Sequence, residues 1–389
     1  MIWRWEREGL RAERYELLYA RALGISPDDL RAGPATPAVS SLLPKARSED
    51  GDDEVKRRQF VMLAASAMSL LDVMRSYAPD LPERVASGAR MDSETAAGLE
   101  NVMLGYRQVY QSAGAAALLD PVCGTLNLLT ELAPSAGAYR DQIVSLIGQS
   151  GSLAATMFML DQGDYPTGLR YLAIAARAAK QSGDSELMSI TMAARAFHSA
   201  YSGDPDDGVA FAREAVSLAS SGTHPRTRGW VSAVESEMQA TVGDEAAYSR
   251  SLDTAAEHVS APMPERQWKG IGAFSPAKLT AYRGAGLMRL KRYGRAQAVL
   301  LAALAQLDPV QVKHRCTAHI DLADAYARDS KLDEAVHHAV SALDIIATTR
   351  HAESMKRVTG LYEAVRPSGT VAARELGSRL LEVRAGSVG

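Results

Sequence analysis

Large aromatic rings and cysteines are scarce in this chain. Its 389 residues include five Phe, four Trp and two Cys. Two cysteines, Cys123 and Cys316, cannot form a disulfide framework, which is typical of proteins in the reducing cytoplasm. The longest apolar run, at residues 60–71, is shorter than the ~20 residues that a membrane-spanning helix needs, so no membrane association is predicted. The net charge of -3 gives no basic signal for nucleic acid.

Alanine, in contrast, is abundant, with 66 residues in the chain. Alanine is the strongest helix former, and its small side chain lets helix backbones approach closely. A core built on alanine therefore needs many closely spaced helices. We predict an all-α protein, and the length fits either two or three domains or one extended array.

Composition divides the chain into four regions. Residues 1–32 are charged and helical in pattern. Residues 33–54 are rich in Pro, Gly, Ser and acidic residues, which is typical of a linker. Residues 55–150 are predicted to form a helical region that caps the rest, and residues 151–389 contain repeats. In the capping region we expect Asp92 to cap one helix and Pro121 to open another.

The repeats are visible as a recurring turn between two helical patterns. Segments 155–179, 195–219 and 235–259 each carry Gly-Asp at the turn, and the turn glycines are spaced 40 residues apart. Two later segments, 283–309 and 322–346, have other residues at that place. The five turn residues, in chain order, are Gly163, Gly203, Gly243, Lys291 and Ser330.

The fourth and fifth segments resemble tetratricopeptide repeats. The matching positions of the fourth are Gly284, Leu287, Tyr293, Ala296, Leu300 and Ala303, and those of the fifth are Tyr326, Ala335, Ala339 and Ala342. The resemblance implies an α-solenoid, a right-handed superhelix of helix hairpins. Each hairpin buries its apolar face only by stacking on a neighbour. The alternative is an unrelated helical bundle.

The first thirty residues resemble the end of a helix-turn-helix domain of the Cro/CI (XRE) type. The matching residues are Ile2, Trp5, Glu6, Gly9, Tyr15, Leu18, Leu23, Gly24, Ile25, Ser26 and Leu30. Joined to a linker and a tetratricopeptide array, this pattern is similar to a group of actinobacterial transcriptional regulators. The resemblance implies a recognition helix in the major groove and a dimer that matches paired DNA half-sites.

The family pattern has two helices and the front of the recognition helix before Ile2, and these are absent here. The retained residues Trp3, Arg4 and Arg7 belong to the end of that helix, where phosphate contacts are more common than base readout. Residues 1–32 also carry no net charge. We therefore expect weak or no DNA binding by the chain as it stands, and DNA as a partner only when the helix-turn-helix domain is complete. The alternative interpretation of Arg4 and Arg7 is an exposed charged helix.

No catalytic motif is present, so the sequence predicts neither an enzyme nor a cofactor. The glycine pairs at 270–272 and 284–286 lack the third glycine of a dinucleotide-binding loop, and there is no phosphate-binding loop or zinc-protease motif. His314, Cys316 and His319 are close in sequence, but His314 and His319 are five residues apart on a helix and point in different directions. No metal site is predicted.

A ligand or partner is expected in the concave groove of the solenoid. Its first helices are predicted to present a mixed set of charged and aromatic side chains, namely Tyr201, Trp230, Glu237, Lys278, Arg289, Asp324 and Arg328. A peptide, a small polar molecule and a protein all remain open as the occupant. A solvated surface is the alternative for each of these residues.

Taken together, the sequence predicts a cytoplasmic, homodimeric regulator of transcription whose repeats sense a ligand or partner. The competing prediction is a tetratricopeptide adaptor that does not bind DNA and acts through protein contacts.

Overall fold

The contacts between Cα atoms divide the chain into two units, residues 1–50 and residues 51–389. A computed structural model describes much of the second unit, and the described residues are 70–87, 90–112, 114–219, 222–264, 267–272 and 274–386. Outside them lie the helix-turn-helix resemblance, the linker and the predicted DNA contacts Trp3, Arg4 and Arg7.

The described residues form helices and no strand, which confirms the all-α prediction. The first helices are α5 (Leu70–Tyr77), α6 (Leu81–Ala86), α7 (Ser93–Val109) and α8 (Ala115–Leu132), followed by the short 3-10 turns η2 (Ala133–Ser135) and η3 (Gly137–Tyr139). Asp92 caps α7 as predicted, because its carboxylate accepts a hydrogen bond of 2.9 Å from the Thr95 N–H.

The expectation for Pro121 is wrong. Pro121 lies inside α8, which begins at Ala115, instead of opening a helix. The neighbouring helix stabilises this position: the Tyr106 hydroxyl of α7 donates a hydrogen bond of 3.1 Å to the Pro121 carbonyl. Tertiary packing on α7 thus outweighs the local cost of proline in a helix.

Six helix hairpins follow, each with a first and a second helix. They are α9 (Arg140–Thr156), extended by the π-helical turn η4 (Met157–Asp161), with α10 (Tyr165–Ser182); α11 (Ser185–Tyr201) with α12 (Pro205–Leu218); α13 (Pro225–Thr241) with α14 (Glu245–Ser260); α15 (Pro276–Arg289) with α16 (Tyr293–Gln306); α17 (Val312–Arg328) with α18 (Leu332–Thr349); and α19 (Ala352–Val365) with α20 (Val371–Gly386).

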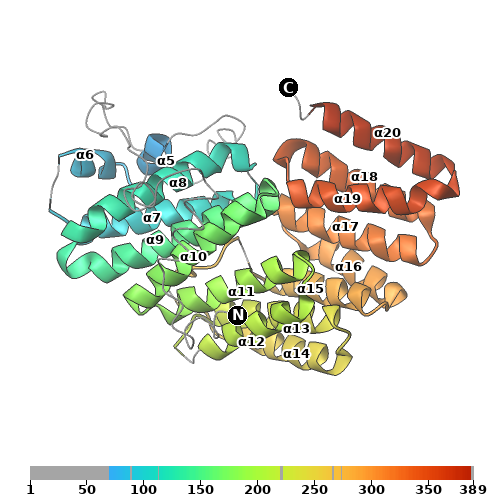
Figure 1. Ribbon diagram of the computed structural model, residues 1–389, viewed down its shortest axis with the longest axis horizontal. Coiled ribbons are helices and arrows are strands. Elements are labelled where there is room, and N and C mark those ends of the chain that lie inside the picture. The colour runs from blue at the N-terminus through green and yellow to red at the C-terminus, as the bar shows by residue number, and fades with distance from the viewer. Residues whose placement is uncertain are drawn as a thin grey trace, which may run out of the picture. The chain divides into compact units, whose positions relative to one another are not determined.

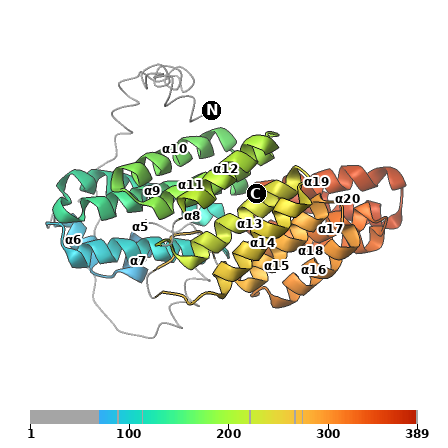
Figure 2. The same ribbon diagram turned by 90° about the horizontal axis from the view of Figure 1, so that it is seen from below.

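These hairpins form a helical-repeat solenoid. Within each hairpin the two helices pack together, and successive first helices also pack on one another. Figures 1 and 2 show the hairpins following one another in chain order. The first hairpin begins at Arg140, and the predicted boundary between residues 150 and 151 lies inside α9.

The five predicted turn residues share one backbone conformation. Gly163, Gly203 and Gly243 have φ of 71°, 95° and 83°, and Lys291 and Ser330 both have φ of 61°. All five are therefore left-handed, a conformation that glycine adopts freely and that a Cβ disfavours. The same turn is kept in the fourth and fifth hairpins although the glycine is not.

Small residues lie where the two helices of a hairpin cross. In the fourth hairpin Ala296 and Ala303 of α16 are fully buried. A Cβ added at Gly284 of α15 would lie 2.4 Å from Cγ of Leu300, so no larger side chain fits at this crossing without movement. Close helix crossings of this kind explain the abundance of alanine in the chain.

Contacts that are distant in sequence join the first hairpin, and Gln111 of the capping region, to the last two hairpins. Lys313 of α17 forms an ion pair of 2.6 Å with Asp161 of η4, and both side chains are buried. The Tyr165 hydroxyl of α10 donates a hydrogen bond of 2.6 Å to the Glu353 carboxylate of α19. The Lys313 N–H also donates to the carbonyl of Gln111, which follows α7. We call these three interactions the closing contacts.

One described segment, Gly137–Asp161, is long and apolar enough to cross a membrane by length and composition alone. In the fold it contains α9, which packs between α8 and α10. Of its most apolar stretch, 78% is buried inside the structure. Its apolar character therefore matches its place as a core helix.

Candidate functional site

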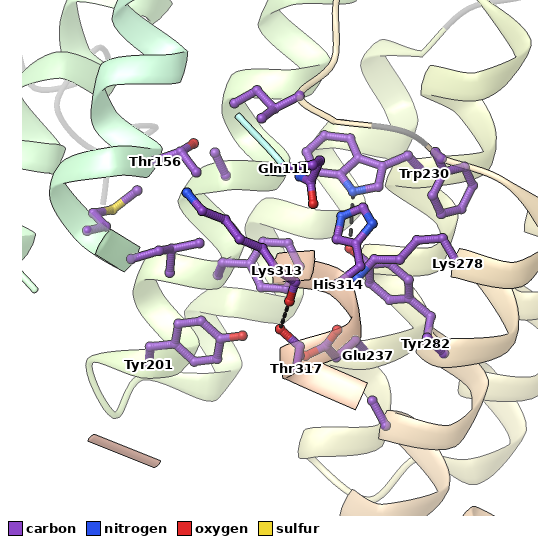
Figure 3. A pocket seen from close by; sticks show the side chains of 18 of the residues that line it. Gln111, Thr156, Tyr201, Trp230, Glu237, Lys278, Tyr282, Lys313, His314 and Thr317 are labelled. Carbon is purple, nitrogen blue, oxygen red and sulfur yellow. Dashed lines mark hydrogen bonds between the residues drawn. The ribbon is translucent and has the colours of Figure 1, made fainter. Parts of the chain in front are cut away.

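The first helices of the hairpins surround a cavity of about 210 Å³. Its lining comes from α11, α13, α15, α17 and α19, from α9 with η4, and from the end of α7. The loop before α15 adds Trp268, Ile271 and Phe274. Figure 3 shows side chains from these elements pointing into the same space. First helices thus supply the cavity wall, while the second helices, apart from Tyr165 at the start of α10, do not.

The structure brings five of the seven predicted groove residues to this cavity. These five are Tyr201, Trp230, Glu237, Lys278 and Arg289. Asp324 and Arg328 do not line it. Asp324 instead lies behind the wall, where it accepts a contact of 3.2 Å from the guanidinium of Arg357.

Most charged groups of the wall are already paired with each other. Arg289 and Glu237 form an ion pair of 2.6 Å between α15 and α13. Arg357 of α19 pairs with Asp321 at 2.6 Å in addition to Asp324. Buried ions require such partners, because an unpaired ion in the interior carries a large desolvation cost. The charges of these arginines are therefore balanced by carboxylates of the protein.

Lys278 differs from the other cations of the wall. Its ammonium has no carboxylate within 4.0 Å among the described residues, and its short-range contact is the ring of Tyr282, whose centroid lies 5.3 Å away. Burial lowers the pKa of this ammonium to about 8, although Glu237 and Asp321 act in the opposite direction. Lys278 is thus a cation in the cavity wall without a directly bonded anion.

The lining also contains aromatic rings in addition to these charged groups. The indole N–H of Trp230 donates a hydrogen bond of 3.1 Å to the Tyr282 hydroxyl. The indole N–H of Trp268 donates to Thr227 at 2.9 Å, and Phe274 packs edge-on against Tyr282. Because both indole donors are used within the protein, these rings offer apolar surface to an occupant.

Four side chains of the wall have a buried polar atom without a hydrogen-bond partner. These atoms are Oε1 of Gln111, Oγ of Ser152, Nε2 of His198 and Nδ1 of His314. Gln111 and Ser152 are only 7% and 2% exposed. Buried polar groups in folded proteins normally have partners, and each missing partner costs free energy. Their concentration around one cavity indicates that a polar occupant or ordered water completes the site.

His314 feels the charges of two ammonium groups of the wall, those of Lys278 and Lys313. Burial lowers its pKa well below the usual range, and the charges of Lys278 and Lys313 lower it further. The imidazole is therefore neutral at pH 7 and adds no positive charge to the cavity. Figure 3 shows His314 beside Lys278 and below the indole of Trp230.

Two further histidines, His319 and His338, do not line this cavity. His319 and His338 approach each other with 3.2 Å between their Nδ1 atoms. Within the part of the chain that the structure describes, no group of three or more His, Cys, Asp or Glu side chains is placed to hold a metal ion.

Sequence reasoning missed several lining residues. Lys313 and Arg357 lie on first helices at places that the repeat pattern would have offered, and the α19–α20 hairpin that carries Arg357 was not recognised as a repeat. Gln111 lies in the capping region, and no local signal connects it to the groove. Its position depends on the closing contacts.

Comparisons with known proteins give little beyond this geometry. No protein-family model matches the chain, and no curated protein shows significant similarity to it. Among solved structures, it is similar to a signal transduction ATPase with numerous domains (STAND) protein with a tetratricopeptide repeat sensor, from Pyrococcus horikoshii. The TM-score is 0.41 and the sequence identity 14%, over 86% of this chain and 53% of that one. The matched part thus spans about half of the neighbour.

Proposed function

We propose that the helical-repeat unit is a ligand-binding module and that the cavity inside its first helices is the binding site. The observation that carries this proposal is the convergence of unsatisfied groups on one cavity. Four side chains that each hold an unpartnered polar atom line the same cavity as Lys278 and the rings of Trp230 and Trp268. A cavity with apolar walls and a few convergent polar groups is the usual form of a small-molecule site.

The test is ligand capture by the purified chain. After incubation with the low-molecular-weight fraction of a cell extract, native mass spectrometry should detect a species bound to the protein. The bound species should also raise the midpoint temperature of the protein's thermal unfolding. Ala194→Leu fills part of the cavity and should reduce the captured amount at least tenfold. Ala173→Leu, on the exposed face of α10, is the matched control and should bind as the wild type does. Equal capture by both variants would contradict this site.

We further propose that ligand binding regulates transcription. The support is the resemblance of residues 1–32 to a helix-turn-helix domain, which lies outside the described residues. In this proposal the protein is a cytoplasmic homodimer, and the occupied repeat unit positions or masks paired DNA-binding domains. DNA is a partner only when the helix-turn-helix domain is complete.

Gel-shift assays separate this regulator from an adaptor that acts by protein contact alone. Specific DNA binding by the chain as given, or by a version with a restored complete helix-turn-helix domain, supports the regulator. Failure of both forms to bind DNA would overturn it in favour of the adaptor. Ligand capture by the repeat unit is independent of either result.

A further inference from the structure

We infer that the cavity binds a compact monocarboxylate with an aromatic or apolar body, and that the carboxylate pairs with Lys278. This inference rests on the proposed function, because it specifies the ligand class of the same site.

The pairing of charges in the cavity wall favours an anionic ligand. Arg289, Arg357 and Lys313 each have a carboxylate partner at 2.6 Å, whereas Lys278 has none within 4.0 Å among the described residues. An anionic ligand would give Lys278 the partner that the protein does not supply. Charge-assisted hydrogen bonds of this kind are stronger than neutral ones, and burial strengthens the attraction between the two charges.

The number of free cations favours a single negative charge. A phosphate group carries close to two charges and is usually held by several donors, often by bidentate arginines. Both arginines of the wall are occupied by Glu237, Asp321 and Asp324. His314 adds no charge, since its imidazole is neutral. One unpaired ammonium therefore matches a carboxylate better than a phosphate.

The body of the ligand follows from the walls beside Lys278. Ala281 and Ala285 lie one and two turns further along α15 and also line the cavity. The rings of Trp230, Trp268 and Tyr282 line the same cavity. Such a surface contacts apolar or aromatic groups and offers them no indole donor, because both indole N–H groups are bonded within the protein.

The closing contacts limit the size of the occupant. An extended peptide in a repeat groove needs open ends through which its chain can pass. Here Asp161, Tyr165, Lys313 and Glu353 join the first hairpin to the last two beside the cavity. The cavity itself measures about 210 Å³. This geometry fits a small molecule rather than a peptide segment.

The experiment is isothermal titration calorimetry of the full chain with defined probes. Phenylacetate, 3-phenylpropionate and indole-3-acetate are the acids, and their primary amides are matched neutral controls. Phenyl phosphate tests the alternative oxyanion, and a capped Phe-containing octapeptide tests the alternative occupant. We expect at least one acid to bind with a dissociation constant below about 1 mM, and its amide to bind at least about tenfold more weakly.

A pair of variants tests the role of Lys278. Lys278→Met should weaken binding of the acid by about 10- to 100-fold and leave amide binding unchanged. Lys291→Met removes a lysine from the exposed turn of the same hairpin and should bind both probes as the wild type does. Acid binding should also weaken as the pH rises above about 8, because Lys278 then loses its proton.

The possible outcomes separate the two proposals. Equal binding of acid and amide, or an unaffected acid affinity in Lys278→Met, would overturn the anionic class. Stronger binding of phenyl phosphate or of the octapeptide than of every acid would overturn the carboxylate or the compact occupant, respectively. If no acid binds, this inference fails, whereas the proposed function fails only if the extract experiment also shows no ligand dependent on the cavity.

Discussion

In the six hairpins the first and second helices bury different side chains. The buried charged residues of these hairpins lie on first helices, with η4 counted as part of α9, and are Asp161, Glu186, Glu237, Lys313, Asp321 and Glu353. The described residues of the second helices bury mainly apolar side chains and a few uncharged polar ones, with no buried charge among them. Apolar burial stabilises the fold, whereas buried charge costs free energy unless it is paired. The comparison thus separates two layers. The second helices form an outer layer that stabilises the fold, and the first helices form an inner layer that carries the site.

The largest expected effect is the loss of a buried ion-pair partner in the inner layer. Lys313→Met leaves the Asp161 carboxylate unpaired in a site where its side chain has no exposed surface. We expect the free energy of unfolding to fall by about 3–5 kcal/mol. Urea denaturation measures this change.

The control for this variant is Lys331→Met, which removes a partner of Asp329 at the surface and should cost about 1 kcal/mol or less. A similar loss of unfolding free energy in both variants would show that burial of the Lys313 ion pair does not increase its effect on stability.

Overpacking of the outer layer should have the next largest effect. Ala339 of α18 has no exposed surface and packs in the core with Ala342 and Leu343. Ala339→Leu should lower the free energy of unfolding by about 1–3 kcal/mol. Because this layer does not line the cavity, ligand affinity should stay within twofold of the wild type when measured at a temperature where both proteins are folded. A large loss of affinity would erase the distinction between the layers.

Substitutions at two equivalent turns should change stability by smaller amounts and in opposite directions. Gly243 has open space around it, so Gly243→Ala meets only the backbone cost of the left-handed conformation, about 1–2 kcal/mol. Lys291→Gly removes that cost at the equivalent turn and should stabilise the protein by about 0.5–1 kcal/mol after the entropic cost of glycine. Thermal unfolding of the two variants should therefore shift in opposite directions. Shifts of the same sign would contradict a shared turn.

The last prediction concerns the pH dependence of stability that Lys278 causes. Its folded-state pKa of about 8 lies below the ordinary lysine value of 10.5. Between these values the unfolded chain binds more protons, so this group makes the free energy of unfolding rise as pH increases. Lys278→Met should remove this rise and should be no less stable than the wild type at pH 7. Urea denaturation at pH 7 and pH 9.5 tests both points, and a destabilised variant at pH 7 would assign Lys278 a structural role.

Local sequence patterns were sufficient to place the turns of the first five hairpins. Gly163, Gly203 and Gly243 marked turns, and alanines such as Ala296 and Ala303 marked helix crossings, because both depend on neighbouring residues. The alignment of the repeats on these turns also placed five of the predicted groove residues on first helices, namely Tyr201, Trp230, Glu237, Lys278 and Arg289.

The rest depends on contacts between distant parts of the chain. Lys313 reaches Asp161 across 152 residues, and no repeat period encodes that meeting. Gln111 lines the cavity because the capping region contacts α17 through its carbonyl. Pro121 was placed wrongly because packing by Tyr106 of α7 overrides a local preference. Sequence reasoning therefore located the wall of the site but not its enclosure.

The closing contacts also bear on how the protein comes apart. A linear repeat array interacts through nearest neighbours, so it can fray from its terminal repeats while its centre stays folded. Here the Tyr165–Glu353 hydrogen bond links residues 188 positions apart, and it joins the first hairpin to the last one. Neither of those hairpins can then open without breaking contacts to the other. Long-range links of this kind slow folding and couple the repeats into one cooperative unit, so loss of the links should turn a single unfolding transition into stepwise fraying.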